Sequence, residues 1–154
     1  MKSKEQKIQF KLSYWPVQYG SLESRANHLF GKTGVEKLLK DYNGQTYWAS
    51  INPVILFPGY KGPHWLNLAI GYGARTMLGG YENTWIDANG AVVNRNDILR
   101  YRRFYLSLDI DLSRIKTKNR LLKSVFSAAN VLKIPAPAIE LSTRVSMRFH
   151  PIFY

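Results

Sequence analysis

Strict alternation of apolar and polar side chains is the feature that most constrains this chain. Segment 104–113 is the clearest case, because its even positions are apolar and its odd positions are Tyr, Ser or Asp. Successive side chains of a β-strand point to opposite faces, so this pattern predicts a strand with one apolar and one charged face. Segments 8–15, 66–75 and 139–153 alternate in the same way, and 46–57 is largely apolar on both faces.

These runs predict a mainly β fold, an antiparallel meander or partial β-barrel of five or six long strands. The compact turn at 58–63, which holds two Pro and two Gly, makes 46–57 and 66–75 a hairpin. The strand count is five if 139–153 forms one strand, and it is six if that segment splits into a hairpin near Ser142.

The long connections carry local structure of their own. Asn89-Gly90 between short apolar segments predicts a small hairpin with a primed turn, which would stand out as a flap. Apolar residues at helical spacing predict one or two short surface helices, at 35–40 and, before Pro135, at 121–129.

Composition limits the class of protein. The chain of 154 residues has the length of one domain, and its formal net charge is +12. The absence of Cys excludes disulfides and thiolate metal sites. No run approaches the roughly 20 apolar residues of a membrane helix, and the first seven residues lack the apolar segment of a signal peptide. We therefore expect membrane contact through strands or a surface helix, and export through a signal on a longer precursor.

Two carboxylates on one strand face are the strongest candidates for chemistry. Asp109 and Asp111 lie about 7 Å apart at ~3.3 Å per residue, which would suit a hard cation or acid–base work. We favour an ion-pair ladder with neighbouring strands, in which Lys11, Arg144 and Arg148 complete a charged interior. The three His are scattered, so we predict no catalytic site, no metal site and no cofactor.

A basic helix is the second candidate surface. Its cationic residues are Lys116, Lys118, Arg120 and Lys123, and its apolar residues are Leu122, Val125 and Phe126. Such a helix can lie on an anionic lipid surface. It could instead meet nucleic-acid phosphates or simply be solvated, but no nucleic-acid-binding motif is recognisable, and we therefore predict lipid and no nucleic acid as the partner.

Two hypotheses for function follow. In the first, the chain is a membrane-associated β-domain with its apolar face towards lipid, a charged interior and aromatic girdles. The girdle residues would be Tyr14, Trp15, Tyr47, Trp48, Trp65, Phe153 and Tyr154. In the alternative, a soluble half-barrel turns its apolar face inward and binds a lipid or other apolar ligand. An enzyme using Asp109 and Asp111 is a third, less favoured reading.

Several segments also carry a family resemblance. They are 41–48 (Asp-Tyr-Asn-Gly-Gln-Thr-Tyr-Trp), 65–74 (Trp-Leu-Asn-Leu-Ala-Ile-Gly-Tyr-Gly-Ala), 100–115 and 133–137 (Lys-Ile-Pro-Ala-Pro). In this order they resemble the carboxy-terminal half of an uncharacterised Gram-negative family of predicted periplasmic lipoproteins. The resemblance implies a location in the cell envelope, at the outer membrane or in the periplasm, and no catalytic residue. It also implies that this single β-rich domain, 1–154, belongs to a longer protein, whose amino-terminal half or second copy would be a partner.

Overall fold

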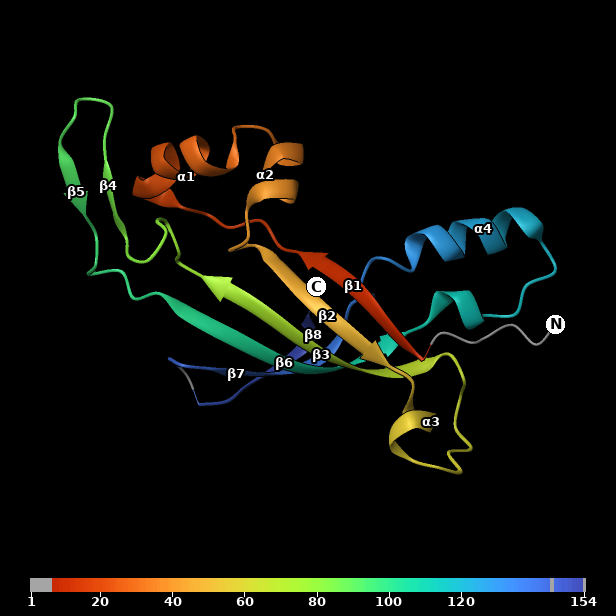
Figure 1. Cartoon of the computed structure of the whole chain (residues 1–154). Coiled ribbons are helices and arrows are strands. Elements are labelled where there is room, and N and C mark those ends of the chain that lie inside the picture. Colours follow the sequence, from red (N-terminus) through yellow and green to blue (C-terminus); the bar gives the residue numbers. More distant parts are fainter. Residues whose placement is uncertain (1–6, 145, 154) are drawn as a thin grey trace.

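An antiparallel sheet of six strands dominates the structure, a computed structural model that describes residues 7–144 and 146–153 (Figure 1). Its order is β1-β2-β3-β6-β7-β8, and β4 and β5 form a separate hairpin. The strands are β1 (Ile8–Tyr14), β2 (Gln45–Ile51), β3 (Leu66–Arg75), β4 (Thr84–Ile86), β5 (Val92–Asn94), β6 (Tyr101–Ile110), β7 (Ala136–Ser142) and β8 (Arg148–Phe153). Each strand of the sheet pairs antiparallel with the next, and β1 and β8 are its two ends, so the predicted meander is confirmed.

The last alternating run divides into two strands. β7 pairs antiparallel with β8, with Glu140 opposite Arg148, so the hairpin alternative is the one that forms. Six strands make an even number, and β1 therefore begins at the end of the sheet where β8 finishes. Val145, in the connection between them, lies outside the described residues.

Helices occupy the connections at both ends of the sheet. They are α1 (Glu23–Phe30), α2 (Gly34–Lys40), α3 (Pro53–Leu56) and α4 (Arg120–Ala129), with 3-10 turns at Gly20–Leu22 and Leu112–Arg114. α1, α2 and the β4-β5 hairpin lie at one end, and α3 and α4 lie at the other (Figure 1). The predicted helices correspond to α2 and α4. Within the described residues, no helix is long and apolar enough to cross a bilayer.

The prediction of a strand over 46–57 is wrong beyond Ile51. The side chain of Asn52 accepts a hydrogen bond from the Val54 N–H, 3.0 Å away, and Pro53 stands at the start of the helix. An Asn cap followed by Pro is a helix start signal. α3 therefore replaces the end of the strand.

The predicted flap forms, but its turn is of another type. The Gly90 N–H donates to the Asp87 carbonyl (3.1 Å), and the Asp87 N–H donates to the Ala91 carbonyl (2.9 Å). Gly90 has φ +80°, whereas Asn89 has no positive φ. A two-residue primed turn needs positive φ at its first central position, and type I′ needs it at both, so the negative φ of Asn89 excludes either type. The Asp87 carboxylate instead accepts the N–H groups of Asn89 and Ala91, which stabilises a longer turn.

Burial across the sheet is the reverse of that in an ordinary soluble sheet. One row of paired residues points inward and is buried or lines the interior: Lys11, Trp48, Gly71, Tyr105 and Glu140. The next row points outward and is exposed or half-buried: Leu12, Tyr47, Tyr72, Phe104 and Leu141. The polar face of the alternating strands is therefore the inside, and the apolar face is the outside.

The sheet curls strongly enough to enclose its polar face. The Lys11 Nζ on β1 lies 2.7 Å from the Asp109 Oδ2 on β6, although β2 and β3 separate these strands. In a flat sheet, strands three positions apart would be about 14 Å apart at ~4.8 Å per strand. Segment 131–133 also covers part of the β1 edge, because the Leu12 N–H donates to the Val131 carbonyl and the Lys133 N–H donates to the Leu12 carbonyl.

Aromatic rings fill one part of the interior. Trp48, which is 1 % exposed, lies over Gly71, where a Cβ would come within 2.7 Å of the indole. Phe153 packs against Trp48 and Tyr105, with ring centroids 5.8 and 4.4 Å apart. The prediction that Trp48 and Phe153 belong to exposed girdles is therefore wrong, while Trp15, Tyr47 and Trp65 are exposed. Tyr14 is half-buried, and Tyr154 lies outside the described residues.

Candidate functional site

A buried ion pair lies at the centre of the polar interior. The side chains of Lys11 and Asp109 are both 0 % exposed. The Lys11 Nζ also donates to the Ile110 carbonyl (2.8 Å) and to the Asn130 Oδ1 (3.0 Å), and the Ser50 hydroxyl donates to the Asp109 Oδ2 (2.6 Å). Buried charges are tolerated where they are paired and hydrogen-bonded. These contacts tie β1, β2 and β6 to the residue that follows α4.

Asp111 forms a second buried cluster, which the Asn130 side chain joins to the first. Its carboxylate accepts hydrogen bonds from the side chains of Gln9 (2.7 Å) and Asn130 (3.1 Å). It pairs with Arg114, whose Nε lies 2.8 Å from the Asp111 Oδ2, and it accepts the Ser113 N–H at the start of the 3-10 turn. Asp111 therefore positions the chain as it leaves β6.

The structure places three of the five predicted interior residues as expected. Lys11, Asp109 and Asp111 are buried inside. Arg144 is exposed in the β7–β8 connection, 5.9 Å above the Tyr101 ring, so its assignment to the interior is wrong. Arg148 is exposed; it lines an open cavity beside the interior and pairs with neither aspartate. The ion pairs of the two aspartates form across the interior and to a following turn, and not between adjacent strands.

The two aspartates do not form a shared cation site. Asp109 is held by Lys11 and Ser50, whereas Asp111 is held by a different set of donors. Among the described residues, no group of three or more His, Asp and Glu side chains is placed to hold a metal ion. The arrangement stabilises a charged interior and provides no acid–base pair.

Lys133 is an interior cation that sequence reasoning missed. Its Nζ donates to the carbonyls of Leu108 (2.7 Å) and Ile134 (2.9 Å) and lies 4.9 Å from the centre of the Trp48 ring. Burial lowers the pKa of Lys133 to about 8, although the Asp109 carboxylate opposes this shift. Lys133 lies in a connection with no alternating pattern, so its sequence context carried no signal of burial.

The basic helix α4 makes little contact with the rest of the chain. The Asn119 side chain caps it by accepting the N–H groups of Leu121 and Leu122, and no residue of α4 is buried. Leu122 and Val125 are exposed, and Phe126 is half-buried. The four predicted cationic residues, Lys116, Lys118, Arg120 and Lys123, are exposed as well. An amphipathic helix with an uncovered apolar side therefore lies beside one end of the sheet.

The outer face of the sheet is a continuous apolar surface, which we call the apolar belt. Its exposed residues are Phe10, Tyr47, Ile70, Tyr72, Phe104, Leu106, Leu108, Ile139, Leu141 and Phe149. Phe10 is 82 % exposed and Leu106 is 51 % exposed. Scattered exposed apolar residues are normal in soluble proteins, but contiguous apolar faces mark binding or membrane surfaces.

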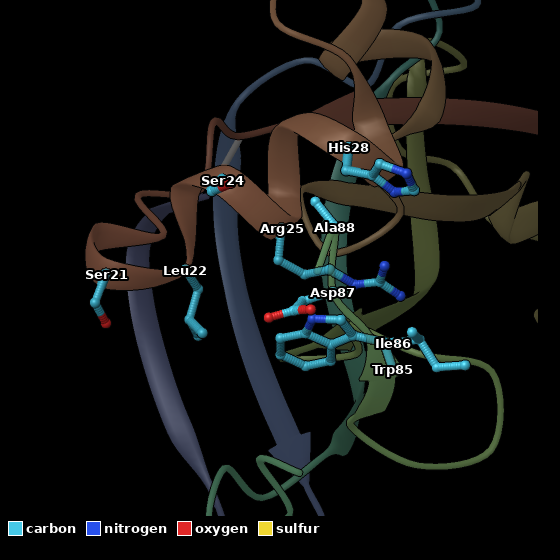
Figure 2. A pocket seen from close by; sticks show the side chains of 9 residues that line it. All are labelled: Ser21, Leu22, Ser24, Arg25, His28, Trp85, Ile86, Asp87 and Ala88. Atoms are coloured by element: carbon cyan, nitrogen blue, oxygen red, sulfur yellow. The ribbon is translucent and has the colours of Figure 1, made fainter. Parts of the chain in front are cut away.

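A separate pocket lies between α1 and the flap, as Figure 2 shows. The Arg25 guanidinium lies 4.8 Å from the centre of the Trp85 ring, and its Nε donates to the Leu78 carbonyl (3.1 Å). Leu78 belongs to a small core with Phe30 and Tyr19, which packs the connections against one another. His28 and Asp87 line this pocket, but the Asp87 carboxylate is engaged by the flap turn. We interpret the pocket as a packing contact.

Comparisons with known proteins add no relative. No family model matches the chain, and no curated protein or solved structure shows significant similarity to it. The resemblance to predicted periplasmic lipoproteins therefore stays a prediction. Function must be argued from the geometry.

Proposed function

We propose that this chain is a membrane-associated β-domain of the outer bacterial envelope, with a structural or binding role. Its apolar belt would face lipid, and its charged interior would face inward. The observation that carries the proposal is the reversed burial, in which Lys11 and Asp109 are fully buried while Phe10 and Leu106 are exposed. Strands that cross a bilayer alternate apolar residues outward with polar residues inward.

The energetics favour lipid over water around the belt. Fully burying one large apolar side chain is worth roughly 1.5–3 kcal/mol, and the belt leaves ten such residues at least partly uncovered. Lipid would cover them without further protein. Trp15, Tyr47 and Trp65 are exposed aromatic residues at or near strand ends, where amphipathic rings suit the membrane–water interface.

An open sheet in a membrane requires further strands. Within the described residues β8 pairs only with β7, and Pro151 in β8 lacks an N–H group, which is a feature of edge strands. Unpaired backbone groups are costly in hydrocarbon. The proposal therefore includes a partner at the β1 and β8 edges, either the amino-terminal half of a longer protein or a second copy of this chain.

The soluble alternative does not fit the direction in which the alternating apolar side chains point. A half-barrel that binds an apolar ligand inside would need the alternating apolar residues on its concave face. That face here carries Lys11, Asp109 and Asp111. We therefore favour the membrane-associated domain.

Fractionation tests the proposal directly. The chain would be exported to the periplasm of a Gram-negative host, and its membranes would be washed with alkaline carbonate. We expect the protein to stay in the outer-membrane fraction and to migrate differently on a gel before and after heating, because lipid-facing sheets resist extraction. Complete release into the soluble fraction would contradict the proposal.

The basic helix predicts a dependence on lipid charge. Each Lys near an anionic surface is worth about 1 kcal/mol, so changing Lys118 and Lys123 to Gln should weaken binding to anionic vesicles on the order of 30-fold. Binding to zwitterionic vesicles should not change. Changing Lys32, which precedes α2, and Lys40, its last residue, to Gln removes the same charge and serves as the control. Equal losses from both double variants in a flotation assay would refute a specific role for α4.

A further inference from the structure

A cationic cavity of about 320 Å³ is lined by Trp15, which follows β1, and by residues along the length of β8. Its charged side chains are Arg75 on β3, Arg103 on β6, and Glu140, Arg148 and His150 on β7 and β8. The three guanidinium groups face a single carboxylate. Glu140 is itself engaged by His150, whose Nε2 lies 2.7 Å from the Glu140 Oε2. Counting the described residues alone, the cavity therefore holds at least two positive charges without a compensating carboxylate.

Two hydrogen-bond donors in this region have no acceptor. The Arg103 Nε and the Tyr105 hydroxyl are both buried, and neither has a hydrogen-bond partner among the described residues. They lie two positions apart on β6, so both point into the interior, and the Arg103 guanidinium lies 5.5 Å from the centre of the Tyr105 ring. Burial raises the pKa of Tyr105, so its hydroxyl keeps its proton and remains a donor.

Buried hydrogen-bond donors without an acceptor, next to an excess of positive charge, indicate that a negatively charged acceptor binds here. Buried polar groups are almost always paired in folded proteins, and leaving one unpaired costs stability. With the described residues Arg75 makes one long hydrogen bond, from Nη1 to the Asn43 carbonyl (3.3 Å), which leaves its other N–H groups available to a ligand. Guanidinium groups bind phosphate and carboxylate in a bidentate manner.

We propose that this cavity is a binding site for a phosphate group, with Arg75, Arg103 and Arg148, which line it, as ligands. Two uncompensated positive charges match a phosphate dianion better than a single carboxylate. Trp15, Ile152 and Phe153 supply apolar lining, so the phosphate could belong to a lipid headgroup or be free in solution. The site does not depend on the proposed membrane location, because it is formed within one chain.

The test is titration of the refolded full chain with inorganic phosphate, at constant ionic strength in chloride. We expect saturable binding that Arg103→Gln and Arg148→Gln each weaken about tenfold or more. Arg102→Gln is the matched control, because Arg102 is exposed on the opposite face of β6. Arg102→Gln should leave the affinity unchanged.

The melting temperature in phosphate-free buffer shows whether a variant has lost phosphate binding or has lost its fold. Since the Arg103 Nε has no acceptor in the free protein, Arg103→Gln should not lower the melting temperature in phosphate-free buffer. A short-chain phosphatidic acid that binds more tightly than inorganic phosphate would identify a lipid headgroup as the ligand, and equal affinity would identify a free phosphate. The proposal is wrong if binding is not saturable, or if Arg102→Gln weakens it as much as Arg103→Gln.

Discussion

Replacing Asp109 with Leu should lower the free energy of unfolding by about 3–5 kcal/mol, because it leaves the Lys11 ammonium buried without a counter-charge. Lys11 is 0 % exposed and lies 2.7 Å from the Asp109 carboxylate. Lys11→Met should cause a loss of similar size, since it leaves the carboxylate unpaired. The measurement is equilibrium unfolding in urea of the detergent-refolded chain.

The double variant distinguishes an ion pair from two independent packing defects. With both charges removed, the apolar replacements can pack together, and a buried ion pair replaced in this way often costs little or nothing. We therefore expect the double variant to recover most of the lost stability, which gives a large coupling energy. Asp97→Leu, which breaks the exposed Arg95–Asp97 pair on the flap side, is the control and should leave unfolding unchanged. Additive losses in the double variant would contradict a coupled pair.

The loss of stability caused by Leu106→Arg should show whether the apolar belt faces lipid or water. Leu106 lies in the middle of β6, between Ile70 and Ile139 of the neighbouring strands, and it is 51 % exposed. At the midplane of a bilayer an Arg on the lipid face costs about 2–4 kcal/mol. On a water-facing surface the same substitution usually changes the free energy of unfolding by no more than ~0.5 kcal/mol.

The experiment compares Leu106→Arg with Val92→Arg, which puts the same side chain on the exposed flap. Both variants would be reconstituted in lipid vesicles and unfolded with urea. We expect Leu106→Arg to lower the free energy of unfolding by about 2–4 kcal/mol. Val92→Arg should leave it almost unchanged. If both variants match the original chain in vesicles, the apolar belt does not face lipid.

The period-two pattern was a sound guide to local structure. It predicted all the long strands of the sheet, because side-chain alternation follows directly from strand geometry. The same alternation places Gln9 on the face of β1 that carries Lys11. It could not predict that the Gln9 side chain donates a hydrogen bond to Asp111, because the two residues are 102 positions apart in the sequence. The pattern failed at Asn52, where a cap and a proline outweighed apolar continuity.

Neither α1 nor the burial of two cationic side chains was predicted from the sequence, and the reasons differ. α1 had a usable signal, since Leu22, Ala26 and Phe30 recur at helical spacing and pack into one small core. Arg114 and Lys133 had no such signal. Arg114 lies in a 3-10 turn and Lys133 in an irregular connection, and the alternation of a strand predicts the burial of neither. Arg144 was misplaced for the same reason, as it lies in the turn that ends the alternation.

The sequence by itself determined the strands, their two chemically distinct faces and the basic helix, because these follow from local periodicity. It could not decide which face of the sheet is inside, since the same alternation serves a soluble sheet and its inverse. Only the tertiary structure decided that, through the curl that brings Lys11 to Asp109 across two strands and through the indole of Trp48 over Gly71. Curvature is a collective result of packing between distant segments, and no local pattern encodes it.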